Sequence, residues 1–491
     1  MLVTYRHETH GGKGNCDEST RFGVLKETMK FGNVKYVDIE YQFAEKFLKG
    51  IEGVDRGGTE VIVSYHEFER TIDGEGLMQV YQRILKLQGI GVDVIKIAIP
   101  GKGPSALCDL LRVLQGSVMK MIGIVMGDGG IASRVLCAKF GGLLTFATVE
   151  SSGMRGSAPG QLSVEELLGK YRFRSISNET AFYGIIGKPV QHSMSPTLHN
   201  LAFQRLSENA VYVPFLLTAS TENTGLFIRK LLQIGCKGLS ITIPCKMDAM
   251  EVMDYLSPSS RQIDAINTVT TNNIYIAGFN TDWSAAISAI LKTVKPEMKE
   301  EDIVDRETDV VKGQAKDVSK GKKMVCLGAG GTARAVLYGP LQMGVESVVI
   351  VNRTLEKAKE LEYMVDDKRV SVMSLDEFKE KGAGEIDILA NTTSVGMSPN
   401  VGVSPIPESL LKPEMIVFDA VYNPMETELL RLAKKAGCKT VSGLDMFVGQ
   451  AVRQLQHWFP LKHDLIPTEE MKNLVIENLQ KPVKEVAEAK R

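Results

Sequence analysis

The chain has 491 residues and a formal net charge of −1, with 44% hydrophobic and 24% charged residues. This length predicts two to four domains, and the composition is typical of globular proteins. The balanced charge argues against a nucleic-acid or membrane binder, and no apolar run approaches the roughly 18 residues of a membrane helix. Seven scattered cysteines fit a reducing compartment and argue against a disulfide framework or a zinc site.

The first 175 residues alternate strand-like and helix-like segments. Helical patterns, for example at 76–87 and 105–114, separate most of the strand patterns. The predicted strands cover 2–5, 34–39, 61–64, 94–99, 121–125 and 143–147. Repeated β–α units imply a parallel sheet, and six strands instead of eight predict either an open sheet or a (β/α)8-type barrel lacking its first two βα units.

A second α/β block begins near Ala181 and runs to residue 290. Its first strand, 182–187, is followed by a helix that starts at Ser195-Pro196, because proline is favoured in the first helical turn. The segment 293–323 that follows is rich in charged residues, and we expect it to be a flexible surface linker.

Four polar clusters in the second block suggest chemistry. Ser193 and Ser195 precede a helix, where two hydroxyls can bind a carboxylate, although a simple helix cap gives the same pattern. Lys246 follows a buried strand and is either a catalytic cation or a surface lysine. Asn267 marks the third cluster. Asp282 marks the fourth, and near Lys246 it would hold the ammonium and shuttle a proton.

A glycine-rich turn between a strand at 324–327 and a helix at 332–341 predicts a dinucleotide site. Its G-x-G-x-x-A pattern lets the backbone approach a pyrophosphate at a helix N-terminus, although a glycine turn that only packs a helix on a strand remains the alternative. The residues are Gly328, Ala329, Gly330, Gly331, Thr332 and Ala333. The next strand, 347–351, ends in Asn352, Arg353 and Thr354, where an acidic residue usually binds the ribose. Arg353 can pair with a 2′-phosphate, which favours NADP over NAD.

From 182 to about 480 the sequence resembles shikimate dehydrogenase in its motifs H-S-x-S-P, T-I-P-x-K, A-x-N-T, G-x-N-T-D, G-A-G-G and N-R-T, and in the segment 443–451. The resemblance implies that Lys246 and Asp282 form the catalytic pair and that Ser193 and Ser195 bind the substrate carboxylate. It further implies contacts to substrate from Thr242, Asn267, Tyr422 and Gln450. Predicted helices at 448–458 and 468–479 complete this region.

The resemblance implies reduction of the C3 carbonyl of 3-dehydroshikimate, with Lys246 stabilising the oxygen and supplying a proton. Two departures bear on substrate choice. Cys245 stands where a histidine is common, and Gln191 precedes His192 where small residues are common. Both can tune the site toward quinate, so quinate dehydrogenase is the alternative, ranked second because Thr242 and both serines match the shikimate pattern.

Residues 1–175 resemble type I 3-dehydroquinate dehydratase, and the whole order resembles the plant bifunctional dehydratase/shikimate dehydrogenases. Lys96, flanked by apolar residues in a strand, suits Schiff-base chemistry because desolvation favours a neutral amine, and His66 is placed to take the α-proton. Taken alone, each is as easily structural. The resemblance carries over, as substrate-binding residues, Arg6, Arg134, Ser157 and Gln161.

Two departures predict that the dehydratase activity is impaired. The family pattern R-x-x-x-E-G-G is matched from Arg6 onward, but His10 replaces the glutamate that orients the catalytic imidazole. A neutral imidazole cannot stabilise an imidazolium, and Glu8 could substitute only if the loop shifts. The family barrel also has two βα units before the strand 2–5, and here we expect an open edge in their place.

We therefore expect three domains: a dehydratase-like barrel at 1–178, a shikimate-binding domain at 180–290 with 447–491, and an NADP-binding Rossmann domain at 291–446. The predicted protein is a shikimate-pathway oxidoreductase and lyase that uses NADP and small-molecule substrates. The alternatives are a quinate dehydrogenase and a protein whose main activity is the lyase; a non-catalytic scaffold ranks last. We expect a monomer with no metal, nucleic-acid or membrane partner. The resemblance implies the chloroplast, but the N-terminus lacks a transit-peptide pattern, so the cytosol remains the alternative.

Overall fold

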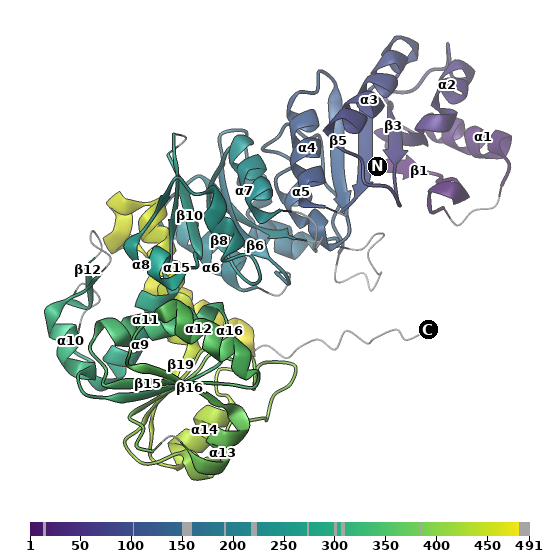
Figure 1. Ribbon diagram of the computed structural model, residues 1–491. Coiled ribbons are helices and arrows are strands. Elements are labelled where there is room, and N and C mark those ends of the chain that lie inside the picture. Colours follow the sequence, from purple (N-terminus) through teal and green to yellow (C-terminus); the bar gives the residue numbers. More distant parts are fainter. Residues whose placement is uncertain are drawn as a thin grey trace. The chain divides into compact units, whose positions relative to one another are not determined.

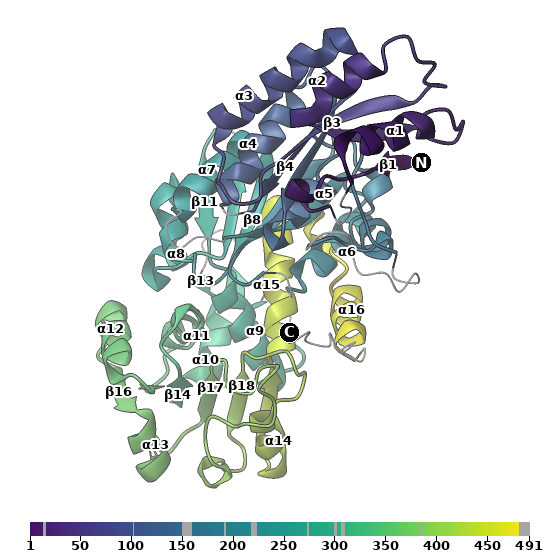
Figure 2. The same ribbon diagram turned by 90° about the vertical axis from the view of Figure 1, so that its right-hand side faces the viewer.

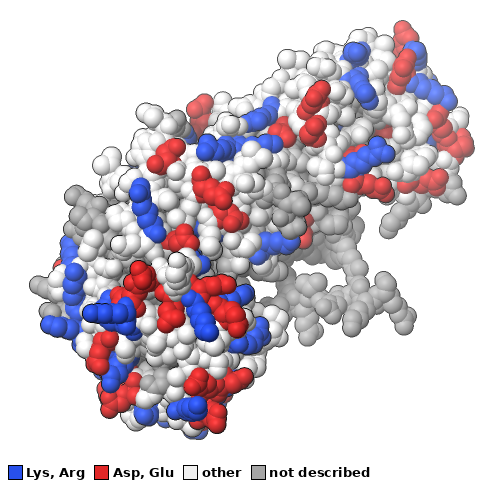
Figure 3. Space-filling view, viewed as in Figure 1, with Lys and Arg blue, Asp and Glu red and all other residues white. Residues whose placement is uncertain are grey.

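The computed structural model describes residues 1–12, 16–101, 103–149, 160–190, 193–217, 223–272, 274–298, 302–305, 310–382 and 384–480. The chain folds into two compact units, 1–196 with 209–236 and 197–208 with 237–491 (Figures 1 and 2). No helix in these ranges is long and apolar enough to cross a membrane. On the face seen in Figure 3, cationic and anionic side chains lie intermixed, in keeping with the balanced charge.

The first unit opens with a parallel sheet of five strands in the order β1-β2-β3-β4-β5. The strands are β1 (Leu2–Thr4), β2 (Tyr36–Glu40), β3 (Glu60–His66), β4 (Val94–Pro100) and β5 (Lys120–Met126). The helices between them are α1 (Glu18–Thr28), α2 (Tyr41–Gly50), α3 (Gly74–Leu85) and α4 (Pro104–Gln115), and α5 (Ile131–Val135) follows β5. Every residue of β2 and β4 is buried, as expected for parallel strands covered on both faces.

The predicted sixth strand at 143–147 is wrong. These residues form no strand; only single bridges flank them, Met121 with Gly142 and Thr148 with Ser163. Leu143 donates its N–H to the carbonyl of Met121, so the segment begins along β5 and then diverges. An apolar segment beside the edge of a sheet has the composition of a strand even when its backbone makes no ladder of hydrogen bonds to the sheet. The sequence pattern of 143–147 therefore could not distinguish a paired strand from an unpaired segment.

The first unit also contains a parallel pair, β6 (Ala181–Gly187) with β7 (Ala210–Leu216), and helix α7 (Thr224–Gln233). Helix α6 (Ser195–Arg205) follows β6 and has Pro196 in its first turn, as predicted. The two strands are apolar and almost wholly buried. Asp109 of α4 pairs with Lys230 of α7 at 3.4 Å, and a further hydrogen bond joins Arg112 to Gln233.

In the second unit, β8 (Cys236–Ile241) pairs antiparallel with β10 (Thr268–Thr271), which pairs antiparallel with β11 (Ile276–Phe279). Strand β9 (Tyr255–Leu256) runs parallel to β11, and helix α8 (Pro258–Ile263) follows it. Helix α15 (Gly443–Trp458) packs across these strands, and Trp458 donates to the carbonyl of Val269 at 3.1 Å. Gly238 permits this approach, because a Cβ there would lie 2.3 Å from the indole nitrogen.

The rest of the second unit is a six-stranded parallel sheet in the order β16-β15-β14-β17-β18-β19. Its strands are β14 (Lys323–Leu327), β15 (Ser347–Asn352), β16 (Val370–Ser374), β17 (Ile388–Asn391), β18 (Ile416–Asp419) and β19 (Lys439–Ser442). Its helices are α11 (Gly331–Gln342), α12 (Leu355–Val365), α13 (Leu375–Lys381) and α14 (Glu428–Lys435), and the C-terminal helix is α16 (Thr468–Gln480). This strand order, which reverses between β14 and β17, is that of the Rossmann fold, as predicted.

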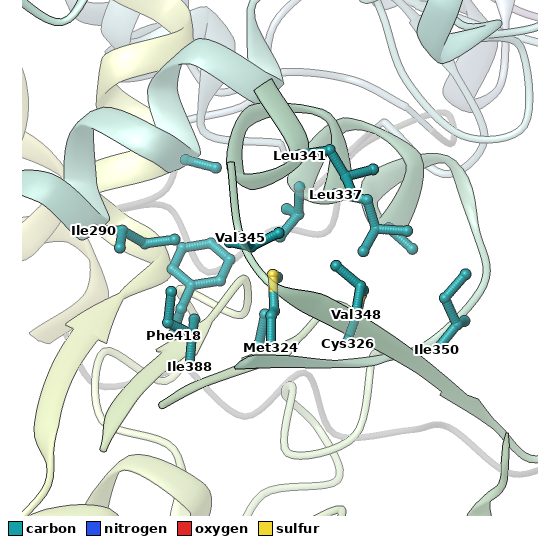
Figure 4. Packing of buried hydrophobic residues seen from close by; sticks show 14 of the residues in the cluster. Ile290, Met324, Cys326, Leu337, Leu341, Val345, Val348, Ile350, Ile388 and Phe418 are labelled. Atoms are coloured by element: carbon teal, nitrogen blue, oxygen red, sulfur yellow. The ribbon is translucent and has the colours of Figure 1, made fainter. Parts of the chain in front are cut away.

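One face of this sheet packs against α11 and against α9 (Asp282–Val294). Figure 4 shows Met324, Cys326 and Phe418 reaching from the strands toward Leu337 of α11 and Ile290 of α9. All five side chains are at most 2% exposed. The packing fixes the loop after β14, which is the loop that the glycine motif occupies.

The predicted flexible linker at 293–323 is wrong for the residues described. It contains a short hairpin, β12 (Val304–Asp305) with β13 (Val310–Val311), and helix α10 (Gly313–Ser319). Ile303, Val311 and Ala315 are buried against Trp283 of α9. Its charged residues dominate the composition, but these few well-spaced apolar side chains are enough to anchor the segment.

Candidate active sites

Lys246 and Asp282 form an ion pair in the second unit. The ammonium nitrogen lies 2.5 Å from Asp282 Oδ2, and the side chains are only 12% and 9% exposed. Lys246 lies in the turn after β8, and its carbonyl accepts the N–H of Ile266 at 2.9 Å. Asp282 is the first residue of α9. The sequence therefore correctly predicted that these two side chains lie together.

Asn267 and Thr281 hold Asp282 in place. The amide nitrogen of Asn267 donates to Asp282 Oδ1 at 2.8 Å and to Thr281 Oγ1 at 2.9 Å, while its oxygen accepts the N–H of Thr281. Asn280 Oδ1 accepts the N–H of Asp282. Because one carboxylate oxygen binds Asn267 and the other binds Lys246, the carboxylate cannot rotate freely. Asp282, held in this orientation, in turn fixes the position of the Lys246 ammonium.

The glycine motif forms a tight loop between β14 and α11. Gly328 has φ +109°, and a Cβ there would lie 2.7 Å from Thr392 Oγ1, so only glycine fits. Gly330 precedes the first residue of α11, and no side chain caps the N–H groups of that helix. A Cβ on Gly331 would lie 3.7 Å from Lys246 Cδ. The motif and the Lys246–Asp282 pair therefore adjoin.

These features fit a dinucleotide. The uncapped start of α11, formed by Gly331, Thr332 and Ala333 after Ala329, offers N–H groups and a positive dipole end to a pyrophosphate. At the end of β15, Asn352 donates to the carbonyl of Thr354, which shapes the turn. Arg353 in that turn is exposed and makes no hydrogen bond or ion pair within the described residues.

The other residues predicted to contact the shikimate-type substrate lie at strand and helix ends. Ser193 Oγ accepts the N–H of Ser195, the first residue of α6, in the first unit. In the second unit Thr242 follows β8, and its carbonyl accepts the N–H of Cys245. The Tyr422 ring stacks on Phe447 at 4.3 Å, and Gln450 donates to the carbonyl of Phe447. Gln191 and His192 lie outside the described residues.

The first unit holds a second polar cluster, on the strands β2, β3 and β4 and just after β1. Lys96 Nζ lies 2.8 Å from Asp38 Oδ2, and Arg6 donates to both oxygens of Asp38 at 3.0 and 3.3 Å. Ser64 donates to Asp38 Oδ1 at 2.6 Å and accepts from Arg6 at 2.9 Å. Burial alone would raise the pKa of Asp38, but the charges of Lys96 and Arg6 outweigh it and hold that pKa far below its usual range.

His66 ends β3 beside this cluster and has no partner for its Nδ1 atom within the described residues; the same holds for His10. The two rings meet edge to face with centroids 6.0 Å apart. Burial, followed by the charges of Arg6 and Lys96, lowers the pKa of His66 to about 3. His66 is therefore neutral at pH 7. The negative charge of Asp38 acts in the opposite direction and raises its pKa, but among the described residues no carboxylate bonds to His66 Nδ1.

Three further residues were predicted to bind the dehydratase substrate. Arg134 is 3% exposed and donates to the carbonyls of Val125 and Gly130, so at least part of its guanidinium holds the loop after β5. Gln161 lies in the segment before Leu162, whose carbonyl accepts the N–H of Thr148. Ser157 lies outside the described residues.

Sequence reasoning missed three buried polar residues at these sites. Asp38 lies in the run Tyr36–Glu40, where an acid in a fully buried strand was an available signal. Asn391 and Asp419 end the neighbouring strands β17 and β18, and the amide of Asn391 donates to Asp419 Oδ1 at 2.9 Å. Asp419 also accepts from Thr427 Oγ1 and from the N–H of Val421.

Asp419 should give the second unit a distinctive pH dependence. Burial, opposed by three hydrogen bonds, raises the pKa of this fully buried carboxyl to about 6. Because the folded pKa exceeds the unfolded one, the contribution to stability is complete below about pH 4 and is lost as pH rises through about 6. We expect Asp419→Asn to remove this pH-dependent loss of stability. Between pH 5 and 7.5 the free energy of unfolding of the variant should therefore rise, relative to that of the wild type, by on the order of 1 kcal/mol. Thermal unfolding of both proteins at the two pH values measures the gain, and an equal gap at both would contradict it.

Comparisons with known proteins cover both units. Residues 1–178 match the family model described as type I 3-dehydroquinase, 185–269 the shikimate dehydrogenase substrate binding domain, and 310–419 the shikimate/quinate 5-dehydrogenase model. The chain is 39% identical to a bifunctional 3-dehydroquinate dehydratase/shikimate dehydrogenase, named as chloroplastic, from Arabidopsis thaliana, over 93% of this chain and 72% of that protein.

Two further matches concern the dehydrogenase part. A shikimate dehydrogenase (NADP(+)) from Caldanaerobacter subterraneus is 38% identical over 58% of this chain and 93% of its own length. A crystal structure of a shikimate dehydrogenase in complex with NADP+ superposes with a TM-score of 0.52 and 34% identity, covering 62% of this chain and 98% of that one.

Proposed function

The chain belongs to the family of bifunctional 3-dehydroquinate dehydratase/shikimate dehydrogenases, and we propose roles for its residues on that premise. It is a shikimate-pathway enzyme that combines an NADP-dependent oxidoreductase with a type I lyase. In the reductive direction the first reaction turns 3-dehydroshikimate into shikimate. The lyase turns 3-dehydroquinate into 3-dehydroshikimate.

In the dehydrogenase, Gly328 to Ala333 would hold the pyrophosphate of NADP and Arg353 its 2′-phosphate. Bound NADPH supplies the hydride. Lys246 donates a hydrogen bond to the C3 oxygen of the substrate, stabilises the negative charge that develops there and provides the proton. Asp282 keeps the ammonium aimed and balances its charge, while Ser193 and Ser195 receive the substrate carboxylate.

The observation that carries this proposal is the buried Lys246–Asp282 pair beside the glycine loop, where a Cβ added to Gly331 would lie 3.7 Å from Lys246 Cδ. Oxidation of shikimate and quinate, each with NADP and with NAD, tests it. We expect shikimate with NADP to give the highest kcat/KM, by at least roughly tenfold. A preference for quinate would instead support the quinate dehydrogenase alternative.

Arg353 should govern the choice of cofactor. Its exposed guanidinium, with no protein partner among the described residues, can form charge-assisted hydrogen bonds with a 2′-phosphate. We expect Arg353→Ala to raise KM for NADP by about 10- to 100-fold and to leave kcat and the NAD reaction nearly unchanged. The control is Arg431→Ala, which removes an exposed arginine paired with Glu428 on α14. Equal losses with both cofactors would rule out this role.

For the lyase, Lys96 would form the Schiff base and His66 would take the α-proton. We propose that this reaction is impaired, because His10 and not a carboxylate faces His66. A neutral imidazole adds no compensating charge when His66 accepts a proton, and the site already contains Arg6 and Lys96. Turnover of 3-dehydroquinate at the rate typical of the family would contradict this.

We further propose the domain division 1–178, 180–290 with 447–491, and 291–446. It is supported by the matched models and by the separate sheets around β1–β5 and β14–β19. We also propose that the chain is a monomer that binds small molecules. Its proposed location is the chloroplast, on the ground of the relative named as chloroplastic, with the cytosol as the alternative. Light scattering of the purified chain and fluorescence imaging of a tagged chain test the two.

A further inference from the structure

Asp38 is the most deeply buried charge of the first unit's polar cluster. Its carboxylate is 1% exposed in the middle of β2, and all its partners come from other strands or from the residues after β1. In the register of the sheet, Ser64 stands directly opposite Lys96, and Asp38 is opposite Ile62. Burying a carboxylate is costly unless charges and donors compensate it, and here an ammonium, a guanidinium and a hydroxyl do so.

The two carboxylate oxygens of Asp38 contact different sets of partners, and these partners have different roles. Oδ1 receives Ser64 Oγ at 2.6 Å and one nitrogen of Arg6, whereas Oδ2 receives the other nitrogen of Arg6 and Lys96 Nζ at 2.8 Å. Arg6 and Ser64 thus fix the plane of the carboxylate. Asp38 Oδ2 also accepts from Lys96 Nζ, which is the nitrogen that would form a covalent bond with substrate.

We propose that Asp38 is the counter-ion of the iminium formed at Lys96, and that Arg6 and Ser64 position it for that task. The inference rests on the dehydratase half of the proposed function. The Lys96 ammonium and the substrate ketone give an iminium and one water: the C–N bond forms and the C–O bond breaks. One positive charge is on nitrogen before and after, so a carboxylate that stabilises the ammonium also stabilises the iminium without moving.

This arrangement separates two steps of the lyase. Asp38, Arg6 and Lys96 would support formation of the iminium. Loss of the α-proton needs His66, whose partner in this chain is His10. The adduct should therefore form normally and turn over slowly, which makes it accessible to trapping.

The test uses the full chain, 3-dehydroquinate and sodium borohydride, with the adduct at Lys96 measured by mass spectrometry across pH. In Asp38→Asn we expect trapping to fall by at least roughly a hundredfold and its alkaline limit to move to lower pH, because an iminium without a counter-ion loses its proton more easily. Asp93→Asn is the matched control: Asp93 accepts from Arg56 and the N–H of Val61 and is 37% exposed. It should trap like wild type.

Asp38→Asn leaves the buried Lys96 without its carboxylate, whereas Arg6 keeps Glu40 at 3.8 Å, and the change can unfold the first unit. Ser64→Ala removes only a hydroxyl, and we expect a decrease of about five- to tenfold with the same direction of pH shift. Shikimate oxidation, in which neither Asp38 nor Ser64 is assigned a role, serves as an internal standard for the concentration of folded chain. Normal trapping and an unchanged pH limit in both variants would overturn the role of Asp38 alone, whereas no adduct in wild type would overturn the Schiff-base site itself and the inference with it.

Discussion

Replacing Lys246 with methionine is expected to lower kcat for shikimate oxidation by roughly 10³-fold and to change KM by only a few-fold. A positioned general acid contributes about 10²- to 10⁴-fold, and an electrostatic donor at a developing oxyanion contributes a similar factor. Methionine keeps the length and the apolar stem of lysine. The substrate carboxylate and the cofactor are assigned to other residues, so their binding should persist.

The variant leaves Asp282 without its cation in a site where it is only 9% exposed. The double variant Lys246→Met/Asp282→Asn removes that unpaired charge and should be equally inactive but more stable. Lys472→Met is the control, because Lys472 pairs with Asp445 at 2.6 Å on the surface of the same unit. Steady-state kinetics at saturating NADP measures all three. A loss of less than tenfold in the single variant would mean that Lys246 does not touch the reacting oxygen.

Replacing His10 with glutamate is expected to raise kcat of the dehydratase by about 10²-fold. The new carboxylate would lie where the His10 ring now meets His66, within reach of an Nδ1 atom that has no partner among the described residues. A carboxylate there orients the imidazole and stabilises the imidazolium. It should also raise the pKa of His66 from about 3 toward its ordinary value.

The matched control is His10→Gln, which has the length of glutamate without its charge. We expect it to orient His66 but to recover only a small part of the rate. Turnover of 3-dehydroquinate and the pH titration of the His66 ring by NMR report separately on rate and charge. If glutamate and glutamine perform alike, charge on residue 10 is not what limits the reaction.

The sequence motifs indicated the shikimate dehydrogenase family, which the comparisons confirm, because their signals are local. The glycine loop, Lys246 and Asp282 each follow a strand or begin a helix, and such positions converge at the carboxyl edge of a sheet. The same reasoning predicted two strands of the Rossmann sheet, at 324–327 and 347–351, and a helix at 332–341, which in the structure begins one residue earlier, at Gly331.

What the sequence could not supply were pairings between distant residues. Asn267 was predicted to bind substrate hydroxyls, and that stays a prediction. In the structure its amide also holds Asp282, through a contact that spans 15 residues of sequence. Asp38 went unnoticed because its partners lie 26 to 58 residues away. The hairpin near Val304 was missed because a charged composition concealed a few buried apolar positions.

Helix α15 covers a sheet whose strands β8 and β10 lie much earlier in the sequence. Gln454 donates to the carbonyl of Asn267 and accepts from Ser240, and Trp458 donates to Val269, across 187 to 214 residues of sequence. At about 5–20 residues per second, a ribosome needs roughly 10–40 seconds to make the intervening chain. Until then β8 and β10 lack the helix that covers them, so this half of the enzyme depends during synthesis on whatever else shields its apolar strands.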